Sequence, residues 1–158
     1  MKTAADLAAL VRQKTWDKDV VLWVGPTATL LDAIGETQHV VLDLLDLFDE
    51  DRLPMDDEET RMQLIQGLRT RLKSFPTGPR ARTVLVVRST GLLARYHAGV
   101  QVFYEWFCGD FAMVVLALEP VSDGTAWPEY VNCDENLLLK YLTEPGVVKE
   151  AFGEGVNP

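Results

Sequence analysis

Short apolar runs alternate with longer amphipathic segments along the chain. Three of the runs are rich in β-branched residues and are bounded by Gly, Pro or polar residues, a pattern typical of buried parallel strands. They occupy residues 20–24, 84–88 and 112–118. A fourth run, "HVVLDLL" at 39–45, is another strand candidate, although "LLDLF" could equally begin a helix.

Between these runs the apolar positions follow a helical period. Leu7, Leu10 and Val11 recur at helical spacing after Thr3 and Asp6, which predicts an N-capped helix over 4–14. Acidic residues at the start and basic residues at the end of 56–75 suit the dipole of a second helix. Its apolar stripe is Met62, Leu64, Ile65, Leu68 and Leu72. Further helices are predicted at 28–34 and at 134–144, where Pro145 ends the pattern.

This alternation predicts an α/β fold with three layers, in which helices cover both faces of a mostly parallel sheet of about four strands. The 158 residues, 47% of them hydrophobic, are expected to form a single domain over 1–158. No apolar run is long enough to cross a membrane, and the first fifteen residues contain an acid where a secretory leader would be apolar. We therefore expect a cytoplasmic protein.

Cys108 and Cys133 lack the spacing of a metal-binding pair, and the chain has only His39 and His97 as further soft ligands. Free thiols are expected at both cysteines, and no zinc centre.

The stretch "DVVLWVGPTATLLDAIGE" at 19–36 has the order of a phosphate-binding loop, with an apolar strand, a Gly-containing turn and a helical segment. A Walker loop needs a second glycine, a lysine and a hydroxyl at fixed distances from the first glycine. Counted from Gly25, those positions hold Leu30, Leu31 and Asp32. The stretch keeps the shape of a nucleotide-binding loop and lacks the groups that bind the nucleotide.

Other arrangements of reactive residues are equally incomplete. The strand "VLVV" ends in Arg88, where an NTPase needs an acid to organise magnesium. The acids around Asp43 and Asp46 are typical of a solvated face, and Ser89 lacks the flanking glycines of a nucleophile elbow. We expect no enzyme activity, no cofactor and no catalytic or metal-binding residues.

Charge is unevenly distributed along the chain, whose formal net charge is −9. Residues 43–59 carry nine acids and one arginine, whereas 60–104 contain no acid. The basic residues of that second stretch are Arg61, Arg69, Arg71, Lys73, Arg80, Arg82, Arg88 and Arg95. Such a bipolar chain could meet a charged partner with either part.

The order of several segments resembles a known family. They are "VVLWVGPTATLLDAI", "VVLDLLDLF", a helix at 56–74, "TVLVVRSTGLLARYHAGVQVFYEWF", "MVVLALEP" and "PEY". The arrangement is similar to the small accessory proteins of BREX-type bacterial phage-defence systems. It resembles the BrxF type, which are P-loop proteins with a late Pro-Glu-Tyr, and residues 84–120 resemble the BrxB type. The resemblance implies a P-loop NTPase-like fold, here with a degenerate nucleotide site, and a non-catalytic role on larger protein subunits of a defence complex. ATP binding does not carry over, because the lysine and the strand-end acid are missing.

Two functions are open. The bipolar charge and the bulky segment "YHAGVQVFYEWF" favour a protein-interaction adaptor. The alternative is a nucleic-acid-binding accessory subunit that uses the basic segment 61–95 for phosphate contacts. Because ligands of open parallel sheets bind beyond the carboxyl ends of the strands, we expect the partner-binding residues to lie there, beside the loop after Gly25. They are Arg88, Arg95, Tyr96 and Trp106. In the competing interpretation, Arg88 pairs internally with an acid such as Asp43 or Asp46.

Overall fold

One parallel β-sheet organises the protein. A computed structural model describes residues 2–16, 18–48, 56–75, 82–98, 100, 102–105, 111–119 and 147–153. The five strands are β1 (Lys18–Val24), β2 (His39–Asp43), β3 (Thr83–Arg88), β4 (Ala112–Leu118) and β5 (Glu150–Gly153). They lie in the order β2-β3-β4-β1-β5, and every neighbouring pair is parallel.

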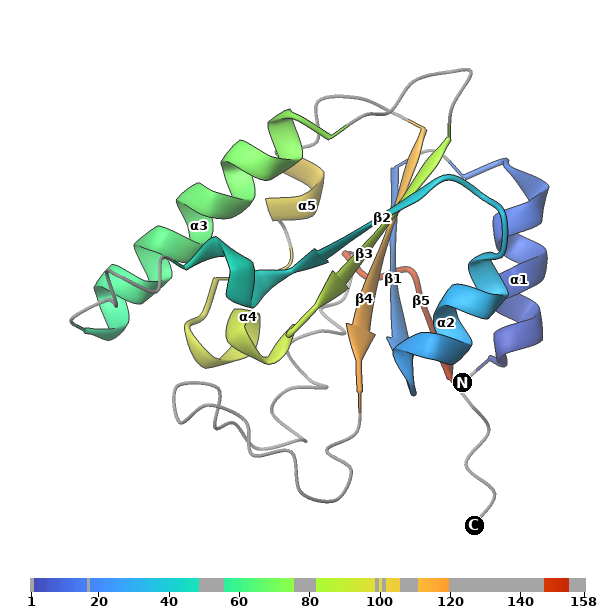
Figure 1. Cartoon of the computed structure of the whole chain (residues 1–158), viewed down its shortest axis with the longest axis horizontal. Helices are drawn as coiled ribbons and strands as arrows, with labels where there is room; N and C mark the ends of the chain where they lie inside the picture. Colours follow the sequence, from blue (N-terminus) through green and yellow to red (C-terminus); the bar gives the residue numbers. More distant parts are fainter. Residues whose placement is uncertain are drawn as a thin grey trace, which may run out of the picture.

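Helices cover both faces of this sheet (Figure 1). On one face lie α1 (Ala4–Gln13) and α2 (Thr27–Ile34). On the other lie α3 (Asp57–Lys73) and the short helices α4 (Gly91–Arg95) and α5 (Val102–Glu105), with the 3-10 turn η1 (Leu44–Leu47) following β2. The predicted α/β architecture with helices on both sides of the sheet is confirmed.

Alternate residues of the central strands enter two separate hydrophobic clusters. In β1, Val20 and Leu22 pack in the cluster beneath α3, whereas Val21 and Trp23 pack in the cluster beneath α1 and α2. The strands β3 and β4 divide their side chains in the same way. Because both faces are buried, these strands need continuous apolar sequence, which is the signal that predicted them.

The helix predictions agree closely with the observed bounds. Thr3 caps α1 and forms the predicted reciprocal pair with Asp6, whose carboxylate accepts from the Thr3 N–H at 2.9 Å. Asp56 caps α3, accepting from the Glu59 N–H at 2.7 Å. In the described part of the chain, no helix has the length and apolar character that a membrane crossing requires.

Three expectations need correction. The sheet has five strands rather than about four, because β5 pairs with β1. The strand candidate at 39–45 ends at Asp43. The Asp43 side chain accepts from the Leu45 N–H at 3.0 Å and starts η1. Met62, placed in the apolar stripe of α3, is 49% exposed.

Some sequence predictions fall outside the described residues. These are the helix at 134–144 and the thiols Cys108 and Cys133.

The α3 interface provides a test of the fold. On α3, Leu64 points into the core and is fully buried, whereas Met62 is exposed. We expect Leu64→Ala to lower the free energy of unfolding by about 2–5 kcal/mol, because it leaves a cavity in the core. The matched Met62→Ala variant is expected to change it by no more than about 0.5 kcal/mol. Urea unfolding of both variants measures the difference, and equal losses would contradict this packing.

Candidate functional site

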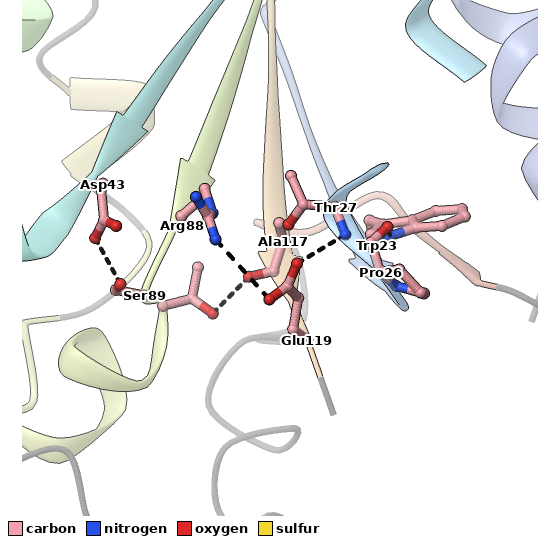
Figure 2. A network of polar contacts seen from close by, with 9 residues as sticks. Trp23, Pro26, Thr27, Asp43, Arg88, Ser89, Ala117 and Glu119 are labelled. Atoms are coloured by element: carbon pink, nitrogen blue, oxygen red, sulfur yellow. Dashed lines mark hydrogen bonds and ion pairs between the residues drawn. The ribbon is translucent and has the colours of Figure 1, made fainter. Parts of the chain in front are cut away.

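Three neighbouring strands bring their carboxyl ends together, and two of them carry a charged residue there. At this edge β3 ends at Arg88 and β4 is followed by Glu119, while β1 leads through Gly25 and Pro26 into α2. Because β3, β4 and β1 are adjacent and parallel, these carboxyl ends lie side by side (Figure 2). This is the position at which open α/β sheets bind their ligands.

The turn between β1 and α2 requires glycine. Gly25 has a φ of 153°, a conformation that L side chains rarely adopt, and its N–H donates to the Leu118 carbonyl at 3.0 Å. A Cβ at this position would lie 3.2 Å from the Trp23 ring. The ring is fixed in turn, since its Nε1–H donates to the Pro26 carbonyl at 3.1 Å. The turn is therefore held by packing and hydrogen bonds within the protein.

Glu119 occupies the N-terminus of α2. Its Oε1 accepts from the Thr27 N–H at 2.8 Å, and Thr27 is the first residue of the helix. Pro26, at the N-cap, supplies no side-chain hydrogen bond. A helix N-terminus carries unpaired N–H groups and a partial positive charge, so it attracts anions. Here the anion is a carboxylate of the chain itself.

The environment of Glu119 favours its charged form. The Thr27 side chain lowers the pKa of the Glu119 carboxyl most, the Thr27 N–H and the nearby charge of Arg88 lower it further, and partial desolvation opposes them. No hydrogen bond of normal geometry joins the buried Thr27 hydroxyl to any described residue. The N–H hydrogen bond is thus the well-formed contact of the pair.

Arg88 lies on the other side of the same carboxylate. One of its terminal nitrogens is 3.9 Å from the second oxygen of Glu119 (Figure 2). Arg88 therefore has an internal acid partner, as in the competing interpretation, but that acid is Glu119 and not Asp43 or Asp46. Asp43 instead accepts from the Ser89 hydroxyl at 2.6 Å, although it is directly opposite Arg88 in the strand register. The Ser89 hydroxyl and the Leu45 N–H both donate to the same oxygen of Asp43, Oδ1.

Hydroxyl groups connect the strand ends further. Thr90 is buried, and its Oγ1 donates to the Ala117 carbonyl at 3.0 Å. Together with the pairs Asp43–Ser89 and Arg88–Glu119, this contact links the ends of β2, β3, β4 and β1 (Figure 2). We call Asp43, Arg88, Ser89, Thr90 and Glu119 the strand-end network. Its members contact one another and the backbone of Thr27, Leu45 and Ala117.

The residues expected to bind a partner do not form one patch. Arg95 lies over the Tyr96 ring, 5.4 Å from its centroid, and 4.0 Å from Asp57 at the start of α3. Arg95 and Arg88 thus belong to different ion pairs. Tyr96 is only 5% exposed and packs in the core, so it offers little surface to a partner. Trp106 lies outside the described residues.

The basic segment 61–95 is also divided. Arg82 lies over the rings of Trp16 and Phe111 and donates to the Lys14 carbonyl, at the amino end of β3. The exposed basic residues near the end of α3 are Arg69, Arg71 and Lys73. Arg80 lies outside the described residues.

Glu119 was not among the site residues predicted from the sequence. The segment "ALEP" was interpreted only as the end of a strand, although a charged residue directly after a fully buried parallel strand is itself a signal of the binding edge. In the described part of the chain, no group of three or more His, Cys, Asp or Glu side chains is placed to hold a metal ion.

Comparison of the chain with protein-family models, with curated proteins and with solved structures finds no match in any of the three. The strand-end network therefore has to be interpreted from its own chemistry.

The Glu119 contacts predict a dependence of stability on pH. A carboxyl with a lowered folded-state pKa stabilises the fold fully above its ordinary value of 4.5, and loses that contribution as the pH falls through the folded-state value. At pH 7 we expect Glu119→Gln to lower the free energy of unfolding by about 0.3–1 kcal/mol, since the side chain is half-exposed and solvent screens its interactions. Urea unfolding from pH 7 to pH 3 should show this difference shrinking below pH 4.5. A difference that is independent of pH would contradict the assignment.

Proposed function

We propose that this chain is a non-catalytic protein-interaction adaptor of a bacterial phage-defence complex, built on a P-loop NTPase-like domain with a closed nucleotide site. The observation that carries the proposal is the Glu119 carboxylate on the first N–H of α2. In a P-loop protein, a phosphate of the nucleotide occupies the N-terminus of the corresponding helix. An internal carboxylate at this place competes with a phosphate and repels it.

The side chains around this turn support the same proposal. Leu30 is fully buried and Leu31 packs beside it in the cluster beneath α1 and α2, where a phosphate-binding loop would place glycine and lysine. Arg88 ends β3, at the position of the magnesium-organising acid. With the nucleotide chemistry removed, binding to other proteins is the function that this domain retains.

The competing function is nucleic-acid binding by the basic segment 61–95. The exposed side chains of Arg69, Arg71 and Lys73 favour it. Against it, three further arginines are held in ion pairs with acids, and Arg82 is stacked on aromatic rings at the opposite edge of the sheet from Arg88. A continuous groove for a phosphate backbone needs these charges together and accessible. We therefore favour the adaptor.

The closed site predicts that the protein does not bind nucleotides. Titration calorimetry with ATP and Mg²⁺ is expected to show no heat of binding, because lysine is absent and Glu119 occupies the helix N-terminus. A P-loop ATPase measured in the same buffer is the positive control. Micromolar affinity for ATP would overturn the closed-site argument.

The adaptor role predicts a stable complex with larger proteins encoded beside this chain. The tagged chain, co-expressed with them, should retain at least one through gel filtration in high salt. Duplex and single-stranded DNA should show no binding in low salt, whereas a nucleic-acid-binding subunit would bind there and dissociate steeply as salt rises. Binding of DNA without a protein complex would favour the competing function.

The co-expression assay also tests whether the partner contacts the carboxyl ends of the strands. Arg88→Glu and Arg95→Glu reverse charges at that edge, and Arg12→Glu is a control on the exposed side of α1. Loss of the complex in the first two, with unchanged thermal melting, would place the partner at the strand ends. A retained complex would direct attention to another surface.

A further inference from the structure

The two outer strands of the sheet are protected very differently. Along β5 the N-terminal segment adds a short parallel bridge, in which the Lys2 N–H donates to the Ala151 carbonyl at 3.2 Å and the Gly153 N–H donates to the Lys2 carbonyl at 2.8 Å. The strand β2 pairs with β3 on one side, and no described residue pairs with its other side. An outer strand without such cover is a template for a further strand.

The unpaired backbone groups of β2 can be assigned from the register. The Val84 N–H donates to the Gln38 carbonyl at 2.9 Å, and His39 is the register partner of Val84. In a parallel pair, this places the backbone groups of Val40 and Leu42 toward β3. Those of His39, Val41 and Asp43 point outward, with Val41 at the centre of the edge.

The side chains at this edge are apolar and accessible. Val40 is 37% and Val41 42% exposed, and of the large hydrophobic residues in the described part of the chain only Met62 shares this character. Both valines line a groove of about 170 Å³ that Leu72, Phe75 and Arg71 close from the α3 side. A cavity of about 150 Å³ holds a benzene molecule, so the groove has room for about one large apolar side chain.

The charge beside the groove is positive. Arg71 lines it and is exposed in the last turn of α3. Arg71 takes part in no ion pair found among the described residues. Asp43, at the far end of β2, is already engaged by Ser89 and the Leu45 N–H.

We propose that the outer edge of β2 binds an extended acidic segment of a partner protein as a sixth strand. Its backbone pairs with Val41, an apolar side chain enters the groove against Phe75, and a carboxylate meets Arg71, the cation that lines the groove. This inference rests on the proposed adaptor function and identifies the chemistry of the partner. A second copy of this chain fits less well, because a two-fold pairing of β2 strands would bring two basic helix ends together.

The probe is a fluorescein-labelled nine-residue peptide in which glutamate alternates with valine or leucine. Its binding to the full chain is measured by fluorescence anisotropy, beside a peptide with lysine in place of glutamate. We expect saturable binding of the acidic peptide and at least about tenfold weaker binding of the basic one. Equal binding of the two peptides, or none, would overturn the proposal.

Two pairs of variants locate the site. Val41→Pro removes the outward N–H at an edge position where proline is tolerated, and Val41→Thr keeps it. Arg71→Glu reverses the charge at the groove, and Arg12→Glu makes the same change on α1, on the other face of the sheet. We expect about tenfold weaker binding in the first member of each pair and less than about twofold change in the second.

The outcomes separate this inference from the adaptor role. Equal peptide affinity in both members of each pair would overturn it, and the arginine pair decides alone if Val41→Pro lowers the melting temperature. Sedimentation showing a dimer that Val41→Pro abolishes would assign the edge to a second copy and also overturn it. If the co-expressed complex survives Val41→Pro and Arg71→Glu, the adaptor role stands and this edge is not its docking site. If the acidic peptide binds as expected but no complex forms, the edge stands and the adaptor role fails.

Discussion

A parallel sheet has to be covered on both faces, and this constraint determines where the protein can place charge. The side chains of β1, β3 and β4 alternate between two hydrophobic clusters, so their central positions leave no room for polar groups. The charged residues of these strands therefore lie at their ends, where Arg88 and Glu119 meet. The outer edge of β2 differs, since Val40 and Val41 are exposed there.

At the strand ends, the need to satisfy helix α2 decides the chemistry. Its first N–H lies beside a glycine turn that brings the backbone of β1 close to that of β4, within reach of Glu119. The carboxylate then positions Arg88, and Asp43 turns to Ser89. One helix terminus thus places Glu119 between Thr27 and Arg88, and both charged side chains stay partly exposed.

The sequence was sufficient for features that depend on local pattern. The central strands and α1, α2 and α3 were predicted because burial on two faces or on one stripe imposes a period that a short window reveals. The strand β5 was missed since its four residues carry no such period, and their pairing with β1 creates the strand. Met62 was misplaced because a stripe on a helical wheel is wider than the contact that α3 makes.

The candidate site was only partly predictable, because its contacts join residues distant in sequence. Thr27 and Glu119 are 92 positions apart, and nothing near either residue indicates the other. Arg88 was expected to bind a partner or, in the competing interpretation, to pair with an acid such as Asp43 or Asp46, and the acid beside it is Glu119, which follows the next strand of the sheet. Tyr96 was assigned to the binding surface because it follows the carboxyl end of a strand, whereas the residue is buried in the core.

The exposure of Val40 and Val41 is the feature that local pattern explains least. Both residues favour a strand, and the chain could have formed the same strand with polar side chains at the two exposed positions. Polar or charged residues there would also have discouraged unwanted pairing, as the Lys2 and Glu150 ion pair does beside β5. Both outer strands, β5 and β2, have a row of backbone groups with no neighbouring strand. Within the described part of the chain, only β5 is covered by a further segment. The apolar character of the other is the observation on which the proposed docking of a further strand rests.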